Sequence, residues 1–317
     1  MRKALVVGIN YYEHVSPLYG CVNDALAVTE SLERNYDGKK NFEVKKILVE
    51  NDTTYLERRG LKQAVLDLFS EDADIALFYC SSHGYVESTG GYIITSDCRH
   101  GDDGVSLNEL LQIANDSPAR NKLIILDCCH SGFMGATNHG FDKSYLSEGL
   151  TILTASTKDQ YAIESNGEGV FTSLFVEALN GSAANLLGEV SPAQIYSQID
   201  LALGAFEQRP LFKTNTKSFV SLKTVKPPIA LSDLHQLTEL FEHPNTPFKL
   251  DPSYEFTSDN PNEENVLKFK TLQKYNRVNL VVPVGEEHMY FAAMNSKSCR
   301  LTELGKRYWS LVEAGRI

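Results

Sequence analysis

Two hydrophobic periodicities alternate along roughly the first two hundred residues of the chain. Short, continuous apolar runs are typical of strands that are buried on both faces. Between them lie segments in which apolar residues recur at helical spacing, such as Leu61, Val65 and Leu68. The sequence predicts strands at 4–10, 42–49, 75–80, 123–126 and 150–155, and helices at 23–36, 55–69, 106–114, 171–179 and 193–203.

This strand–helix order predicts an α/β fold in which helices cover both faces of a mostly parallel sheet. The segment 106–114 opens with Ser-Leu-Asn-Glu, a capping-box pattern that predicts a helix start at Ser106. No glycine-rich nucleotide fingerprint follows the first strand, and no Walker-type loop is present. A Rossmann-type nucleotide enzyme is therefore disfavoured.

The composition changes after Lys226, where six prolines fall between residues 227 and 261. We interpret 227–264 as a Pro-rich linker that contains a short helix at 232–242. Beyond it, a helix, a strand or wing at 288–294 and a last helix indicate a small winged-helix-like α+β module, 265–317. The predicted domains are therefore 1–226, the linker and this module.

Charge and hydropathy exclude some classes of function. The net charge of −11 argues against a general nucleic-acid-binding surface, which needs a basic face. No apolar run reaches the roughly 18 residues that a membrane span needs. The apolar run at the start ends at Asn10 with no cleavage site after it, so we expect a buried first strand rather than a signal peptide.

The six cysteines are scattered along the chain, except for the adjacent pair Cys128 and Cys129. No CxxC pair occurs, so we expect no structural zinc site. His130 beside Cys129 suggests a metal ligand, but no third ligand is placed, so we expect no catalytic metal. Scattered thiols without a signal peptide indicate a reducing compartment, so the expected location is cytoplasmic.

Two motifs carry candidate chemistry, and each follows a predicted buried strand. His83 lies in Ser-Ser-His-Gly, and Cys129 lies in Asp-Cys-Cys-His-Ser-Gly. Catalytic groups of a parallel sheet gather at the carboxyl ends of its strands, so neighbouring strands would bring the two side chains together. A thiol needs a base to become a thiolate at neutral pH, and an imidazole can supply it. The backbone N–H groups of Gly84 and Cys129 are candidate donors to the oxyanion.

These motifs resemble those of the caspase superfamily, in particular its metacaspase and bacterial caspase-like branch. Further matches lie at 4–10, 20–25, 154–156, 169–172 and 208–210. The resemblance implies a three-layer caspase-like sandwich and a cysteine endopeptidase that acts on protein substrates. It implies Cys129 as nucleophile and His83 as general base. It also places Asp24, Ser81 and Asp127 in the pocket for the residue before the scissile bond.

An acidic pocket of this kind favours a basic substrate residue, because two carboxylates can pair with Lys or with the fork of Arg. Caspases that cleave after Asp need arginines there instead, and no Arg or Lys lies between Lys3 and Arg34. We therefore expect cleavage after Arg or Lys. An ordinary helix-terminal role for Asp24 and a loop-capping role for Asp127 are the structural alternatives.

Two residues depart from the family pattern. Cys128 replaces the more usual Ser, which raises the question of which thiol attacks; we assign Cys129 because it directly precedes His-Ser-Gly. Strand alternation is expected to turn Cys128 into the core. Ser82 replaces the more usual Gly before His83 and is expected to tighten the loop that orients the imidazole.

The resemblance also implies regulation and a biological role. Bacterial members of this branch often act as effectors of immunity against phage, some of them switched on by nucleotide signals. No cofactor is expected for the chemistry, whereas calcium, a nucleotide or an activating protein is a candidate activator. The alternatives are an inactive caspase-like scaffold and a nucleic-acid-binding regulator that acts through the C-terminal module.

Overall fold

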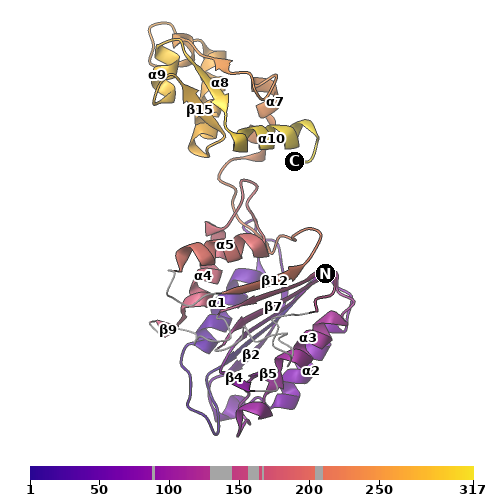
Figure 1. Ribbon diagram of the computed structural model, residues 1–317. Helices are drawn as coiled ribbons and strands as arrows, with labels where there is room; N and C mark the ends of the chain where they lie inside the picture. The colour runs from indigo at the N-terminus through magenta and orange to yellow at the C-terminus, as the bar shows by residue number, and fades with distance from the viewer. Residues whose placement is uncertain (88–89, 129–144, 156–163, 166–167, 204–209) are drawn as a thin grey trace. The chain divides into compact units, whose positions relative to one another are not determined.

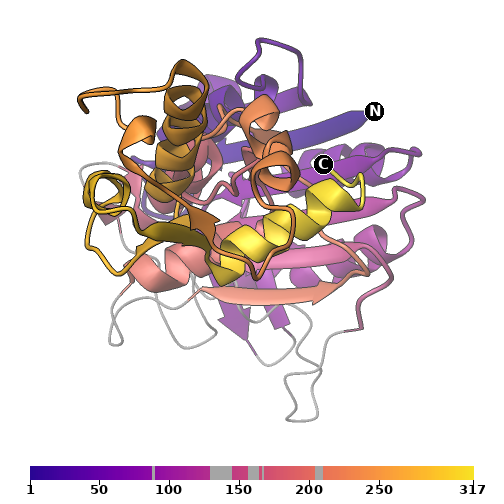
Figure 2. The same cartoon turned by 90° about the horizontal axis from the view of Figure 1, so that it is seen from above.

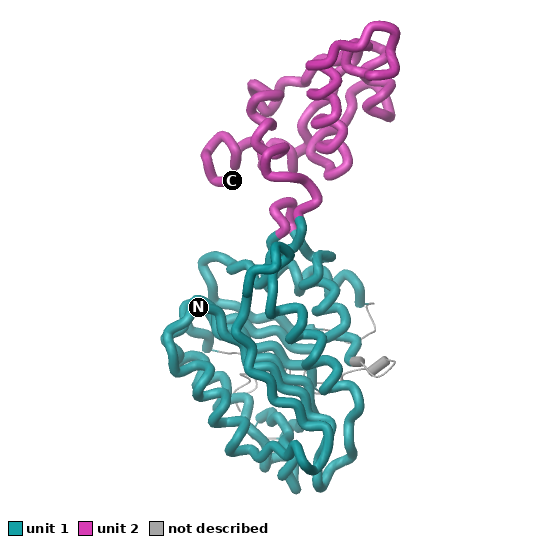
Figure 3. Tube along the Cα trace, turned by 180° about the vertical axis from the view of Figure 1, so that it is seen from behind, with its two compact units in different colours: residues 1–184, 189–226 teal, residues 185–188, 227–317 magenta. Residues whose placement is uncertain are grey.

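The computed structural model describes residues 1–87, 90–128, 145–155, 164–165, 168–203 and 210–317. The chain forms two compact units, shown in different colours in Figure 3. Unit 1 contains residues 1–184 and 189–226, and unit 2 contains residues 185–188 and 227–317. The chain therefore contributes to unit 2 twice, first with the short segment 185–188 and then with all residues after Lys226.

A six-stranded sheet forms the centre of unit 1, with the strand order β12-β8-β7-β3-β1-β2. All neighbouring pairs are parallel except β12 and β8, which are antiparallel. The strands are β1 (Arg2–Ile9), β2 (Glu43–Val49), β3 (Ile75–Ser81), β7 (Asn121–Asp127), β8 (Leu150–Thr154) and β12 (Leu211–Asn215). Every residue of β3 is buried, as expected of a strand covered on both faces.

Helices cover both faces of this sheet (Figure 1). On one face lie α1 (Cys21–Glu33), α4 (Val170–Glu177) and α5 (Pro192–Ala202), and on the other lie α2 (Arg58–Phe69) and α3 (Leu107–Asn115). The two faces bury separate hydrophobic clusters, since successive strand residues point to opposite sides. The predicted three-layer α/β architecture is confirmed.

Several short strands of unit 1 were not anticipated. Strands β4 (Gly84–Glu87), β5 (Gly90–Ile93) and β6 (Val105–Ser106) form an antiparallel sheet directly after His83. The capping box predicted at Ser106 is wrong. This residue is the N-cap of α3, but its side chain makes no capping hydrogen bond and its backbone pairs with Tyr92 in the small sheet.

The shortest elements complete the described part of unit 1. They are β9 (Glu164–Ser165), β10 (Glu168–Gly169), β11 (Glu189–Val190), β13 (Lys223–Thr224), and the helical turns η1 (Asp52–Thr54), η2 (Gly101–Asp103) and η4 (Ala178–Ser182).

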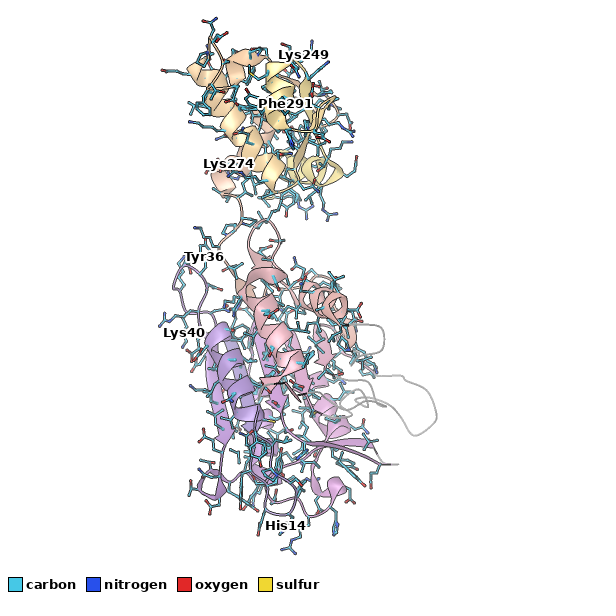
Figure 4. The ribbon with its side chains drawn as sticks, turned by 90° about the vertical axis from the view of Figure 1, so that its left-hand side faces the viewer. His14, Tyr36, Lys40, Lys249, Lys274 and Phe291 are labelled. Atoms are coloured by element: carbon cyan, nitrogen blue, oxygen red, sulfur yellow. The ribbon has the colours of Figure 1, made fainter. Side chains whose placement is uncertain are left out.

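The segment 227–264, predicted to be a linker, is instead a packed part of unit 2. It contains α6 (Leu231–His235), α7 (Leu237–Leu240), β14 (Phe248–Lys249) and η5 (Pro252–Tyr254). Its apolar side chains complete the hydrophobic core of the unit: Ile229, Leu234, Leu237, Phe241 and Leu250. Lys274, labelled in Figure 4, pairs with Asp233 of α6 at 2.9 Å. Of the prolines, Pro244 lies in a turn and Pro252 opens η5.

The remainder of unit 2 contains α8 (Glu263–Arg277), β15 (Val281–Val284), α9 (Met289–Met294), β16 (Ser298–Leu301) and α10 (Glu303–Glu313). The strand predicted at 288–294 is the helix α9, in which Met289, Ala292 and Ala293 are buried at helical spacing. The antiparallel sheet has the order β14-β16-β15, and β16 runs directly into α10 (Figure 2). In the described part of the chain, no helix combines the length and apolarity needed to cross a membrane.

Candidate active site

The carboxyl ends of β3 and β7 lie side by side at one edge of the central sheet. Ser81, the last residue of β3, is the register partner of Asp127, the last residue of β7. The Ser82 N–H extends the pairing by donating to the Asp127 carbonyl at 3.3 Å. His83 and Cys129 each follow this register pair by two residues. Cys129 lies outside the described residues, so the register is what relates it to His83.

His83 is held at its backbone and at its ring. Its N–H donates to Tyr12 Oη at 2.8 Å, and its Nε2 lies 2.9 Å from the Ser16 carbonyl oxygen. The rings of Tyr12 and His83 are tilted against each other with centroids 4.8 Å apart. Tyr12 Oη donates in turn to the Ile9 carbonyl at 3.0 Å. Burial raises the pKa of Tyr12 well above its usual range, so this hydroxyl keeps the proton it donates.

The residues that flank His83 fix the turn between β3 and β4. Ser82 is buried, and its Oγ donates to the His83 carbonyl at 3.2 Å. That carbonyl also accepts the Ile94 N–H at 3.0 Å. Gly84 opens β4 and pairs with Ile93 of β5. The small antiparallel sheet therefore anchors the backbone on which the imidazole sits.

Three of the predicted pocket residues gather beside this edge. Asp24 comes from the first turn of α1, Ser81 ends β3 and Asp127 ends β7; their exposed fractions are 3%, 2% and 5%. Ser81 Oγ donates to Asp24 Oδ2 at 3.0 Å, and the Gly169 N–H donates to Asp24 Oδ1 at 3.0 Å. Both oxygens of the Asp24 carboxylate therefore accept hydrogen bonds, which fixes its plane.

Gly169 brings the two carboxylates together. An ideal Cβ added to this glycine would lie 2.4 Å from Asp127 Oδ2 and 3.0 Å from Asp24 Oδ2. The two carboxylates thus flank one backbone position, which has no room for a side chain. Gly169 is also the N-cap of α4. A helix N-terminus stabilises nearby negative charge, and both carboxylates lie beside the N-terminus of α4.

Asp127 has a second partner on α4. Thr172 Oγ1 donates to Asp127 Oδ2 at 2.6 Å, and Tyr79 Oη lies 2.5 Å from Thr172 Oγ1. Tyr79 is fully buried, and burial together with the nearby charges of Asp127 and Asp24 raises its pKa well above the usual range. The phenol is therefore protonated.

The arrangement can bind a cation. Two carboxylates that are buried close to each other repel, and a positive group placed between them relieves that repulsion. A Lys or Arg side chain supplies both the charge and the hydrogen-bond donors. Within the described ranges, no group of three His, Cys, Asp or Glu side chains has the arrangement of a metal site.

Two other thiols near this edge are packed into the core. Cys128 has an exposed fraction of 2% and lies in the hydrophobic cluster under α2 and α3, as strand alternation predicts. Cys80 is fully buried, and burial raises the pKa of its thiol to about 12. Such a thiol is not a nucleophile at neutral pH.

Sequence reasoning singled out the two motifs and the three residues Asp24, Ser81 and Asp127 that the structure brings together. It gave no role to Tyr12, Tyr79, Gly169 or Thr172. Gly169 and Thr172 lie in the segment 169–172, which matches the family pattern, and this match could have pointed to a role for both residues. Tyr12 follows the end of β1, and Tyr79 lies in the apolar strand β3; both make their polar contacts through the hydroxyl group. Their polar contacts depend on tertiary packing and have no local signature.

Comparison with known proteins identifies relatives of this chain. A family model described as "Caspase domain" matches residues 1–220. Metacaspase-6 of Arabidopsis thaliana is 32% identical over 146 residues, which are 41% of this chain and 38% of that protein. Metacaspase-1 of Schizosaccharomyces pombe is 27% identical over 230 residues, 62% of this chain and 52% of that protein. Metacaspase-1 of Plasmodium falciparum is 33% identical over 152 residues, 41% of this chain and 24% of that protein. The chain thus spans between about a quarter and a half of these relatives.

Solved structures share the fold at low sequence identity. Protein GSU0716 from Geobacter sulfurreducens matches with a TM-score of 0.52 and 15% identity, covering 71% of this chain and 100% of that one. Caspase-1 from Spodoptera frugiperda matches with a TM-score of 0.52 and 12% identity, covering 71% and 91%. These matches show a caspase-like α/β fold.

Proposed function

Because the chain belongs to the caspase-domain family, we propose that it is a cysteine endopeptidase that cleaves protein substrates after Arg or Lys. The observation that supports this most directly is the pair of buried carboxylates, Asp24 and Asp127, on either side of Gly169 at the edge that carries His83. The similarity to three metacaspases supports the same class of activity.

In the proposed mechanism, His83 removes the proton from the Cys129 thiol and the thiolate attacks the scissile carbonyl. A tetrahedral intermediate forms, and the N–H groups of Gly84 and Cys129 donate to its oxyanion. The imidazolium of His83 then protonates the leaving amine, and an acyl-enzyme remains on Cys129. Water hydrolyses this acyl-enzyme, with His83 again acting as base.

The contacts of His83 suit this role. The Tyr12 hydroxyl holds the backbone of His83 and the Ser16 carbonyl holds its ring, and a base held in one orientation loses little entropy when it takes a proton. The Ser16 oxygen lies at Nε2 and accepts a hydrogen bond from the ring when Nε2 carries the proton. The other ring nitrogen then serves as the base toward Cys129.

The proposed specificity comes from charge. A substrate Arg or Lys enters beside Gly169 and pairs with Asp24 and Asp127, while Ser81 keeps the Asp24 carboxylate oriented. An Asp side chain in the same place would add a third negative charge, which this pocket disfavours.

A panel of fluorogenic peptides that end in Arg, Lys, Asp or Asn tests the proposal. The panel is run with and without calcium and candidate nucleotides, with the wild-type protein and with the Cys129→Ala variant. We expect the wild-type protein to release the fluorophore from the Arg and Lys peptides only, and the Cys129→Ala variant to release none. Absence of cleavage under every condition would instead support an inactive scaffold.

We further propose that the protein is a regulated cytoplasmic effector whose second unit receives the activating signal, a nucleotide or a protein partner. Unit 2 has its own hydrophobic core, which supports a separate binding role. Cys80, Cys98 and Cys299 are buried free thiols, which suits a reducing compartment. The role in immunity against phage follows from the resemblance alone.

A further inference from the structure

A chain of two buried hydroxyl groups ends on the Asp127 carboxylate. Tyr79 Oη lies 2.5 Å from Thr172 Oγ1, and Thr172 Oγ1 lies 2.6 Å from Asp127 Oδ2. The three side chains come from β3, from the first turn of α4 and from the end of β7. Their exposed fractions are 0%, 2% and 5%, so water does not compete strongly for these hydrogen bonds.

The direction of the hydrogen bonds follows from the number of protons. A threonine hydroxyl has one proton, and an ionised carboxylate can only accept. Thr172 therefore gives its proton to Asp127 and must accept one from Tyr79. Burial raises the pKa of Tyr79, so the phenol retains the proton that this order requires. The chain runs from Tyr79 through Thr172 to Asp127.

The same carboxylate oxygen is confined from another side. Asp127 Oδ2 lies 2.4 Å from the point where a Cβ of Gly169 would stand, so the backbone of Gly169 and the hydroxyl of Thr172 approach it together. Gly169 and Thr172 both belong to the start of α4. One oxygen of the Asp127 carboxylate, Oδ2, is thus held at the N-terminus of α4.

We infer that Thr172, supported by Tyr79, is a positioning residue that orients the Asp127 carboxylate for the guanidinium of a substrate arginine. This inference rests on the proposed acidic specificity pocket and adds to it a preference for Arg over Lys. A guanidinium is a planar fork that needs acceptor oxygens in a set geometry. An ammonium is a compact charge that accepts a wider range of carboxylate orientations. Fixing the carboxylate therefore favours Arg more than Lys.

The Thr172→Val variant tests this, because it removes the hydroxyl and keeps the shape of the side chain. We expect kcat/KM for an Arg peptide to fall about tenfold, mainly through KM, as for loss of a hydrogen bond to a charged group. We expect a smaller fall for the matched Lys peptide, about threefold. Thr172→Ser should restore the Arg preference, since it returns the hydroxyl.

Two further variants keep the test decisive. Tyr79→Phe removes the hydroxyl that begins the hydrogen-bond chain, so it should also lower the ratio of the Arg and Lys kcat/KM values. This variant takes the place of Thr172→Val if Thr172→Val does not fold. Thr151→Val is the control. It removes a buried threonine hydroxyl that pairs with Thr214 on the edge strand β12, and it should leave the ratio unchanged.

The inference is overturned if Thr172→Val lowers the Arg and Lys values equally, if Thr172→Ser behaves like Thr172→Val, or if neither Thr172→Val nor Tyr79→Phe changes the ratio. These outcomes differ from failure of the proposed function. If the proposed function is wrong, the wild-type protein itself cleaves neither peptide, with or without activators.

Discussion

At the scale of single residues, the adjacent cysteines offer a direct test of the nucleophile. Cys128 is buried in the core, so Cys128→Ala should cost about 1 kcal/mol of stability and leave kcat within about twofold of wild type. Cys129→Ala should abolish peptide hydrolysis and leave the thermal unfolding midpoint unchanged. Activity in the Cys129→Ala variant, together with its loss in Cys128→Ala, would show that the other thiol attacks.

The general base is a second single-residue test. His83→Ala should lower kcat by about 10²–10⁴-fold, because the thiol then lacks its proton acceptor. Tyr12→Phe removes the acceptor for the His83 N–H and the donor to the Ile9 carbonyl but leaves the imidazole in place, so we expect a smaller fall in kcat of about tenfold. Both are measured with an Arg peptide at saturating concentration. An unchanged kcat in His83→Ala contradicts the mechanism.

The proposed charge of the pocket can be reduced by replacing one carboxylate with an amide. Asp24→Asn keeps the shape of the side chain but halves the proposed charge, so KM for an Arg peptide should rise at least tenfold. Glu30→Gln is the matched control: it makes the same charge change on an exposed face of the same helix. If both variants raised KM equally, the effect of Asp24 would come from the net charge of the protein and not from contact with the substrate.

At the scale of elements, a close approach between β1 and α1 places Asp24. A Cβ on Gly8 would lie 2.3 Å from the Cys21 carbonyl oxygen and 2.8 Å from Ala25 Cβ. Gly8→Ala must therefore push the start of α1 away from the sheet. We expect a loss of about 2 kcal/mol in unfolding free energy and a raised KM, because α1 carries the pocket acid.

Gly60→Ala is the control for this substitution. Its added Cβ would meet only Leu56 Cδ1, at 3.3 Å, and Gly60 lies within α2, where alanine is the better helix former. Chemical denaturation of the two variants measures the difference. If Gly8→Ala is as stable as Gly60→Ala, the contact between β1 and α1 does not constrain the pocket.

The elements of unit 1 that the sequence predicted correctly are those with strong periodicity. Buried parallel strands are continuous apolar runs, and their covering helices repeat every three to four residues, so both are visible locally. The antiparallel strands β4, β5 and β12 were missed because they are short, and β4 and β12 are only partly buried. The edge strand β12 also pairs with a strand that is distant in sequence, β8.

In unit 2, composition was misleading. The prolines of 227–264 suggested a linker, yet the apolar residues between them pack against α8 and α10 in one core. Residues 288–294 form a helix because Met289, Ala292 and Ala293 face that core, a choice that tertiary packing makes for a short apolar segment. At the candidate active site, the sequence pointed to Asp24, Ser81 and Asp127, but it gave no role to the hydroxyl groups of Thr172 and Tyr79 that lead to Asp127.

At the scale of the whole molecule, the second unit is the proposed receiver of the activating signal. We expect the full chain to be nearly inactive until calcium, a nucleotide or a protein partner is added, since an unregulated protease damages its host. A chain that ends at Lys226 should no longer respond to that activator. An activator shifts the equilibrium between the inactive and the active state only if it binds the active state more tightly.

The shortened chain needs one correction to be a fair comparison. Leu186 and Leu187 lie in the loop that packs against the core of unit 2, so removal of 227–317 would expose both. Replacing them with serine avoids an aggregation artefact. If the full chain is already maximally active alone, or if the shortened chain is activated to the same degree, unit 2 has no regulatory role.

The cleavage-site profile tests the central claim most directly. The activated protein is incubated with a peptide library of unbiased sequence, and mass spectrometry identifies the residue before each cleaved bond. The proposed pocket of Asp24, Ser81 and Asp127 predicts Arg and Lys at that position, and no cleavage by Cys129→Ala. A dominant Asp at that position, or the same cleavages made by Cys129→Ala, would contradict the account.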